Sequence, residues 1–271
     1  MIRSPDPAAG ADAPSRASGG SLGISKLYKS FGAVHALAGI DLSIARGELC
    51  GLIGPNGSGK STLFDCCTGL TRPDSGTVKL DDLDITDWSQ HRIALQGRLR
   101  RSFQRNVVLG SMTVRENLLL AGQTQALPSI ARSFLHTAAN RRTMQAVGDR
   151  ADELLGLVDL EGLRDTHASE LSVGQQKLLQ FAATLMPSPR IVLLDEPFAG
   201  VNPVLIERLV TSIRWANEQL RSTIIIIEHN IEELFSLCRR VVVLNAGELI
   251  ADGSPGAVAA DEHVVKAYLG V

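Results

Sequence analysis

The sequence predicts an α/β protein with a helical subdomain inserted into the core. Two observations support this fold class. From Leu22 onward, short and continuously apolar runs alternate with segments of helical periodicity, as is typical of a sheet covered by helices. Between about residues 105 and 185, in contrast, the pattern is almost entirely helical. The chain of 271 residues is 44% hydrophobic but only 4% aromatic, so we expect a large core built from aliphatic side chains.

The first expected elements surround a glycine-rich turn. Residues 42–44 and 48–53 have the character of short strands, and the second of them runs into the glycines. The following apolar residues recur at i, i+3, i+4 and i+7, which predicts one buried face of a helix. They are Leu63, Cys66, Cys67 and Leu70.

Three later runs, 191–194, 224–227 and 241–244, are apolar at every position and end at polar residues. Such runs suit strands that are buried on both faces of a sheet. Between the two groups of strands, one apolar stripe with helical spacing predicts a long helix of the inserted subdomain. Its members are Met144, Val147, Ala151, Leu154, Leu155 and Val158.

Composition excludes several classes of protein. Lys and Arg together (27) nearly balance Asp and Glu (29), which argues against a dedicated nucleic-acid binder. No apolar run approaches the roughly 18–20 residues of a membrane-spanning helix. Residues 1–21 lack the layout of a signal peptide and are predicted to be a disordered tail ahead of a single domain, 22–271. The four cysteines show no metal-ligand spacing, so we interpret them as free, buried thiols.

The segment 54–61, GPNGSGKS, fits the phosphate-binding pattern G-x-x-x-x-G-K-[ST] between a strand and a helix. Its glycines let successive backbone N–H groups converge on an anion, and the helix N-terminus adds a favourable dipole. Lys60 would neutralise phosphate oxygens, and the Ser61 hydroxyl would bind Mg²⁺. The predicted nucleotide-binding residues of this segment are Asn56, Gly57, Ser58, Gly59, Lys60, Ser61 and Thr62.

A second site signal lies at the end of the apolar run 191–194, where two carboxylates follow in succession. We expect Asp195 to hold the Mg²⁺ of a nucleoside triphosphate and Glu196 to polarise the attacking water. Many ATPases and kinases share this pair of motifs.

The segment 171–176, LSVGQQ, narrows the class, because it resembles the Leu-Ser-Gly-Gly-Gln signature of the ATP-binding subunits of ABC transporters. Other motifs of that family follow in the family's order over nearly the whole chain, about residues 22–271. They are an adenine-stacking aromatic at Phe31, the glutamine loop at Gln104, the D-loop at 199–202 and the switch histidine at His229.

The resemblance implies a P-loop NTPase (RecA-like) core with an inserted helical subdomain and a small N-terminal antiparallel β subdomain. It implies ATP and Mg²⁺ as ligands, with Gln104 beside the metal and His229 beside the γ-phosphate. One subunit would bind ATP, and the signature of the opposite subunit would cap it. The capping residues would be Ser172, Gly174 and Gln175, with Ser172 as the N-cap of a helix.

Some assignments stay open. Tyr28 lies three residues from Phe31, and either ring could pack in the core instead of stacking on adenine. Val173 replaces the first signature glycine, for which we expect a modest effect. Ala183 and Thr184 stand where the family usually carries an arginine-containing segment.

Finer features resemble the ATPases of branched-chain amino acid importers: the segment 199–203 (AGVNP), the doubled glutamine 175–176 and the ending from Glu248. Urea and amide importers share these features, so the solute stays open. The resemblance implies transmembrane permease subunits as partners, a homodimer or a heterodimer with a related ATPase subunit, and a peripheral place on the cytoplasmic face of the membrane. The alternatives are a non-transport ABC ATPase and a catalytically degenerate partner subunit; a P-loop kinase is disfavoured because it needs no signature segment.

Overall fold

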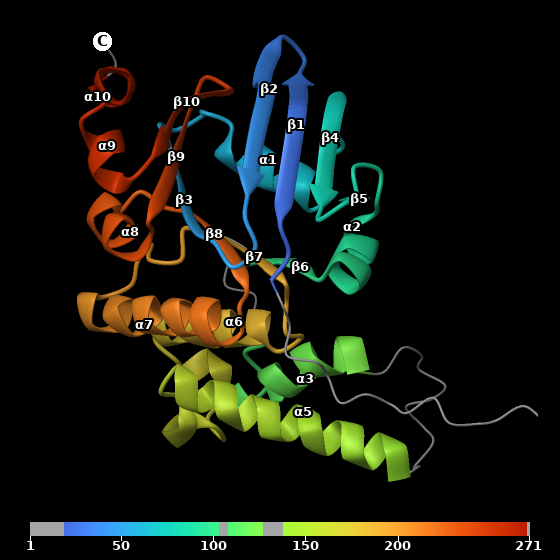
Figure 1. Ribbon diagram of the computed structural model, residues 1–271. Coiled ribbons are helices and arrows are strands. Elements are labelled where there is room, and N and C mark those ends of the chain that lie inside the picture. The colour runs from blue at the N-terminus through green and yellow to red at the C-terminus, as the bar shows by residue number, and fades with distance from the viewer. Residues whose placement is uncertain (1–18, 103–107, 127–137, 270–271) are drawn as a thin grey trace, which may run out of the picture.

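The computed structural model describes residues 19–102, 108–126 and 138–269. Its central sheet has six strands in the order β10-β9-β3-β8-β7-β6 (Figure 1). The neighbours from β9 to β6 are parallel, and only β10 at the edge is antiparallel. This sheet confirms the predicted α/β class. The strands are β3 (Leu49–Ile53), β6 (Leu99–Arg101), β7 (Ile191–Asp195), β8 (Thr223–Ile227), β9 (Arg240–Asn245) and β10 (Glu248–Gly253).

A second sheet is antiparallel, with the order β2-β1-β4-β5. It is the small N-terminal β subdomain that the family resemblance implied, and with α1 it lies against one face of the central sheet (Figure 1). Its strands are β1 (Leu22–Phe31), β2 (Val34–Ile44), β4 (Ser75–Leu80) and β5 (Leu83–Asp84).

The central strands form because both of their faces are apolar. In β7, Val192 and Leu194 belong to one hydrophobic core, whereas Ile191 and Leu193 belong to the other. The isoleucines 224–227 of β8 divide between the two cores in the same alternating way. The prediction of strands buried on both faces is therefore confirmed.

Helices cover the other face of the sheet and extend below it (Figure 1). In the predicted stripe, Ala151, Leu154, Leu155 and Val158 are buried, and Met144 and Val147 are half-buried. The longer helices are α1 (Lys60–Cys67), α3 (Val114–Ala126), α5 (Ala138–Leu157), α6 (Val173–Leu185), α7 (Pro203–Gln219), α8 (Ile231–Leu237) and α10 (Glu262–Leu269). The short ones are α2 (Gln90–Arg92), α9 (Pro255–Ala259), a π-turn (Ile93–Gly97) and two 3₁₀ turns (Glu161–Leu163, Ala168–Glu170).

The predicted bounds of one strand and one helix were wrong. β2 begins at Val34, so the strand expected at 42–44 is far longer. α1 ends at Cys67, and Leu70 lies beyond it with 56% of its surface exposed. The helix stops because Gly69 takes a left-handed conformation (φ 69°). The N–H of Leu70 then donates to the carbonyl of Asp65 at 3.0 Å, which is a Schellman ending.

Residues 1–18 of the predicted tail lie outside the described residues, whereas its last three residues are bonded to the core. The Thr223 hydroxyl donates to the carbonyl of Gly20 at 2.6 Å, and the N–H of Ser21 donates to Asp81 at 2.9 Å. In the part of the chain that the structure describes, no helix has the length and apolar character needed to cross a membrane.

The four cysteines are free and buried, as predicted. Burial raises the pKa of the Cys66 thiol to about 11 and that of Cys50 to about 12. Among the described residues there is no cluster of His, Cys, Asp and Glu that could hold a metal ion by itself.

The double-sided burial of β7 predicts a large cost for removing one of its side chains. Leu193→Ala should lower the free energy of unfolding by about 2–5 kcal/mol, because the side chain is fully buried and leaves a cavity. Leu83→Ala makes the same change at a side chain that is 51% exposed, and should cost far less. Urea unfolding of both variants measures the difference; equal losses would contradict this account of the core.

Candidate functional site

The site lies where neighbouring parallel strands end. β3, β8 and β7 are adjacent and run in the same direction, so their carboxyl ends meet at one edge of the sheet. β3 leads into the glycine-rich loop 54–59, β7 ends at Asp195, and β8 is followed by Glu228 and His229. The topology therefore brings together three of the predicted motifs.

The loop 54–59 depends on glycines where the backbone is crowded. A Cβ on Gly54 (φ 153°) would lie 2.0 Å from the carbonyl oxygen of Leu244, and one on Gly59 (φ 104°) 2.3 Å from that of Ala36. Gly57 (φ 77°) faces open space. The loop is thus wedged between β9 and β2, and its tip is left free for a ligand.

The other predicted residues of the loop differ in exposure. Asn56 and Ser61 are exposed, Thr62 is half-buried and Ser58 is buried. Ser61 is the second residue of α1, so its hydroxyl lies at the positive end of the helix dipole.

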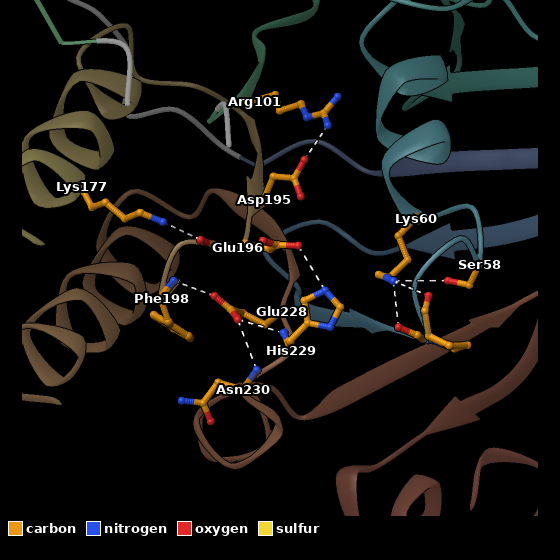
Figure 2. Close-up of polar contacts among 12 residues, drawn as sticks. Ser58, Lys60, Arg101, Lys177, Asp195, Glu196, Phe198, Glu228, His229 and Asn230 are labelled. Carbon is orange, nitrogen blue, oxygen red and sulfur yellow. Dashed lines mark hydrogen bonds and ion pairs between the residues drawn. The ribbon is translucent and has the colours of Figure 1, made fainter. Parts of the chain in front are cut away.

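Lys60 is 6% exposed and folds back onto the loop (Figure 2). Its Nζ donates to the carbonyls of Gly54 at 2.8 Å and Pro55 at 3.0 Å, and to the Ser58 hydroxyl at 3.3 Å. Burial lowers the pKa of Lys60, and the carboxylates at the end of β7 partly offset this effect. A phosphate group would supply the negative charge that such a buried ammonium favours.

Asp195 has the geometry of a metal ligand. Its side chain is 1% exposed, and Oδ2 accepts from Arg101 at 2.5 Å. Oδ1 is buried and has no hydrogen-bond partner among the described residues. A buried carboxylate oxygen without a partner is costly and fits a divalent cation or a water bound to one. The donor set of Asp195 and the exposed Ser61 hydroxyl therefore suits Mg²⁺.

Arg101 also pairs with Asp65 of α1, so one guanidinium joins the helix of the phosphate loop to β7. The sequence alone predicts no role for Arg101. Its only signal in the sequence is its position three residues before Gln104 of the predicted glutamine loop, because nothing local shows that two distant aspartates meet it.

Glu196 and His229 lie side by side. His229 Nε2 is 3.1 Å from Glu196 Oε1, and the Glu196 backbone is left-handed (φ 49°), which is unusual for a residue with a side chain. Two contacts hold this backbone: the Glu196 N–H donates to the carbonyl of Ile227 at 2.9 Å, and Lys177 Nζ donates to the Glu196 carbonyl at 2.8 Å (Figure 2). Backbone strain that is held in this way is typical of functional sites.

Lys177 was also missed from the sequence. It lies on α6, on the opposite side of the strand ends from Lys60 (Figure 2). Its contact ties the helix that carries the signature segment to the acidic residue at the end of β7.

The signature segment opens α6, and the predicted N-cap at Ser172 is confirmed. The Ser172 hydroxyl accepts from the N–H of Gln175 at 3.3 Å, while the Gln175 side chain accepts from the N–H of Ser172 at 2.9 Å. A Cβ on Gly174 would lie 2.5 Å from Cδ1 of Leu205, so a larger residue there would displace the end of that side chain. Val173 is 54% exposed, so its side chain is accommodated at the surface.

Three remaining positions complete the predicted set. Phe31 is 53% exposed at the end of β1, with Lys29 Nζ 5.4 Å from its ring centre, and Tyr28 is 44% exposed with its hydroxyl beside Gly39, so neither ring is packed in the core. In the D-loop, Asn202 caps α7 by accepting from the N–H of Leu205 at 3.0 Å. Gln104 lies outside the described residues.

Comparison with known proteins gives a consistent result. Residues 37–199 match the family described as ABC transporter, and residues 248–271 match that of the branched-chain amino acid ATP-binding cassette transporter. The chain is 35% identical over 249 residues to the high-affinity branched-chain amino acid transport ATP-binding protein BraF of Pseudomonas aeruginosa, covering 92% of this chain and 97% of BraF. It is 33% identical over 251 residues to the lipopolysaccharide export system ATP-binding protein LptB of Escherichia coli, covering 90% and 95%.

Among solved structures, an ATP-binding cassette of an ABC transporter in its ADP conformation superposes with a TM-score of 0.79 and 32% identity, covering 93% of this chain and 99% of that one. A nucleotide-free cassette gives a TM-score of 0.78, also at 32% identity, and covers 93% and 100%.

The Arg101 bridge predicts a selective loss of stability. Arg101→Met leaves the buried Asp195 carboxylate without its counter-ion, so unfolding should become easier by about 3–5 kcal/mol. Arg72→Met removes a pair whose side chains are 77% and 69% exposed, and should cost about 0–1 kcal/mol. Denaturant unfolding of the two variants measures both changes in the free energy of unfolding. A change for Arg101→Met as small as that for Arg72→Met would contradict a stabilising role of the Arg101 ion pairs.

Proposed function

This chain belongs to the ABC transporter family as an ATP-binding subunit with ATPase activity, and we propose that its hydrolysis of ATP powers the import of branched-chain amino acids or a related small polar solute. The observation that carries the proposal is the convergence of Lys60, Asp195 and the Glu196–His229 pair at one sheet edge. The match of residues 248–271 to the branched-chain amino acid family supports the class of solute.

In the proposed division of labour, the amides of the loop 54–59 and the Lys60 ammonium bind the β- and γ-phosphates. Phe31 stacks on adenine. Ser61 and Asp195, together with Gln104, would hold Mg²⁺, which when bound neutralises charge on the phosphate oxygens. Asp195 is already oriented for this role, because Arg101 fixes one carboxylate oxygen and leaves the other free.

Glu196 is the proposed general base. Its carboxylate would accept a proton from the attacking water, and His229, 3.1 Å away, would hold that carboxylate and contact the γ-phosphate. The Glu196 backbone is left-handed (φ 49°), and its side chain faces His229.

The exposed N-terminus of α6 supports a site shared between two subunits. The Ser172 hydroxyl accepts an N–H within its own capping box, so its hydrogen stays available for a phosphate oxygen of a partner's ATP. Gly174 and Gln175 would contribute beside it. The partner would be a second copy of this chain or a related ATPase subunit.

We place the chain on the cytoplasmic face of the cell membrane, bound to transmembrane permease subunits. A cavity of about 350 Å³ between α1, α2 and β6 supports a docking surface. Arg100 lines it, with Nε and Nη2 buried and without a partner among the described residues. An acidic side chain of the permease would satisfy that guanidinium.

Other functions are less well supported. The similarity to lipopolysaccharide export ATPases concerns the same ATPase machinery, whereas the match at 248–271 favours the amino acid class. A catalytically degenerate partner subunit would not be expected to keep Glu196 paired with His229.

Glu196→Gln should lower kcat for ATP hydrolysis by about 10²–10⁴-fold, because an amide cannot accept the water's proton. The variant should still bind ATP and form a nucleotide-stabilised dimer in size-exclusion chromatography. Glu207→Gln, a matched change at an exposed position of α7, should leave hydrolysis unaltered. If Glu196→Gln hydrolysed ATP at the wild-type rate, Glu196 would not be the general base. If the variant did not bind ATP, the shared-site mechanism would be contradicted.

A further inference from the structure

Glu228 is a buried acid next to the site. Only 3% of the surface of this residue is exposed. Oε1 accepts from the N–H of Phe198 at 2.6 Å (Figure 2). Oε2 accepts from the N–H of His229 at 2.9 Å and from that of Asn230 at 3.3 Å. One carboxylate therefore bonds to two separate stretches of backbone.

These two stretches carry different parts of the proposed machinery. Phe198 lies directly before the D-loop segment 199–202 and two residues after Glu196. His229 is the residue that faces Glu196. We propose that Glu228 is a positioning residue that fixes the backbone of the switch histidine relative to the D-loop, and so sets the contact between His229 and Glu196.

An ionised carboxylate, with acceptor sites on both oxygens, suits this geometry. Three N–H donors converge on the side chain from two directions, which requires both oxygens to accept. Burying a charged group is unfavourable unless hydrogen bonds compensate it. A glutamine would offer one acceptor and turn its NH₂ group toward the remaining donors. The carboxylate of Glu228 is thus buried at a free-energy cost, but a glutamine in its place would lose part of the hydrogen bonding between the two stretches of backbone.

The electrostatic surroundings oppose the charge that these hydrogen bonds favour. Burial raises the pKa of Glu228 above its usual range, the nearby Glu196 acts in the same direction, and the three backbone donors only partly offset this shift. Burial lowers the pKa of Lys177, whose ammonium donates to the Glu196 carbonyl, and the charge of Glu228 partly offsets this effect. Among the described residues, Glu228 has no hydrogen bond or ion pair with Lys60 or the phosphate loop, so its effect would pass through His229 and the D-loop backbone.

The test compares Glu228→Gln and Glu228→Asp with Glu232→Gln, a matched change at an exposed position of α8. Because small displacements of reacting groups cost rate and not binding, kcat for ATP hydrolysis should fall about 10- to 100-fold in Glu228→Gln. KM for ATP and the affinity for a non-hydrolysed ATP analogue should stay within about twofold. Glu228→Asp, which still reaches its own loop but not Phe198, should lie between Glu228→Gln and the wild type.

A double-mutant cycle separates positioning from a general structural role. If Glu228 acts through His229, adding Glu228→Gln to a His229→Ala chain should lower kcat by less than about twofold. Multiplicative losses, or a Glu228→Gln chain that turns over at the wild-type rate, would overturn the inference. Thermal unfolding is measured on every chain, and Glu228→Asp carries the comparison if Glu228→Gln does not fold.

This inference rests on the proposed ATP hydrolysis, and the controls keep the two apart. A wild-type chain that hydrolyses no ATP would contradict both. A wild-type chain that hydrolyses ATP, with Glu228 variants equal to it, would contradict the positioning role alone.

Discussion

The site depends on one constraint, the parallel register of β8 beside β7. In that register Asp195 lies opposite Ile227, so the next residues, Glu196 and Glu228, leave the sheet at the same level. The register is fixed because alternate side chains of both strands fill two different cores, and a slip of one residue would exchange every apolar contact. The packing of the sheet thus decides which acid meets His229.

Charged side chains then join the layers around this edge. Arg101 connects α1 to β7, Lys177 connects α6 to the Glu196 carbonyl, and Glu228 connects β8 to the chain before α7. Glu228 is buried and the other two are half-buried, and contacts away from water are strong when complete and costly when broken. The signature segment lies at the start of α6, and Lys177 of the same helix contacts the Glu196 carbonyl. A displacement of the exposed N-terminus of α6 would therefore be transmitted to Glu196 of the same subunit through Lys177.

Much of this arrangement could be predicted from the sequence, because it depends on local pattern. Continuous apolar runs revealed the buried strands, the glycine spacing revealed the phosphate loop, and a serine before an apolar helix revealed the cap at Ser172. The end of α1 was missed because it depends on the conformation of Gly69. Arg101 and Glu228 were missed for another reason: each derives its importance from partners that only the tertiary fold brings close.

The central claim is that each ATP is held between two chains, with the phosphate loop from one and the signature from the other. Mixing two inactive variants, Lys60→Ala and Ser172→Arg, tests it most directly, because a mixed dimer contains one intact shared site. At concentrations where ATP makes the wild type dimeric, an equal mixture should recover about a quarter of wild-type turnover, given random pairing and one working site of two. A mixture that stays as inactive as either variant alone, although mixed dimers form, would contradict the shared site.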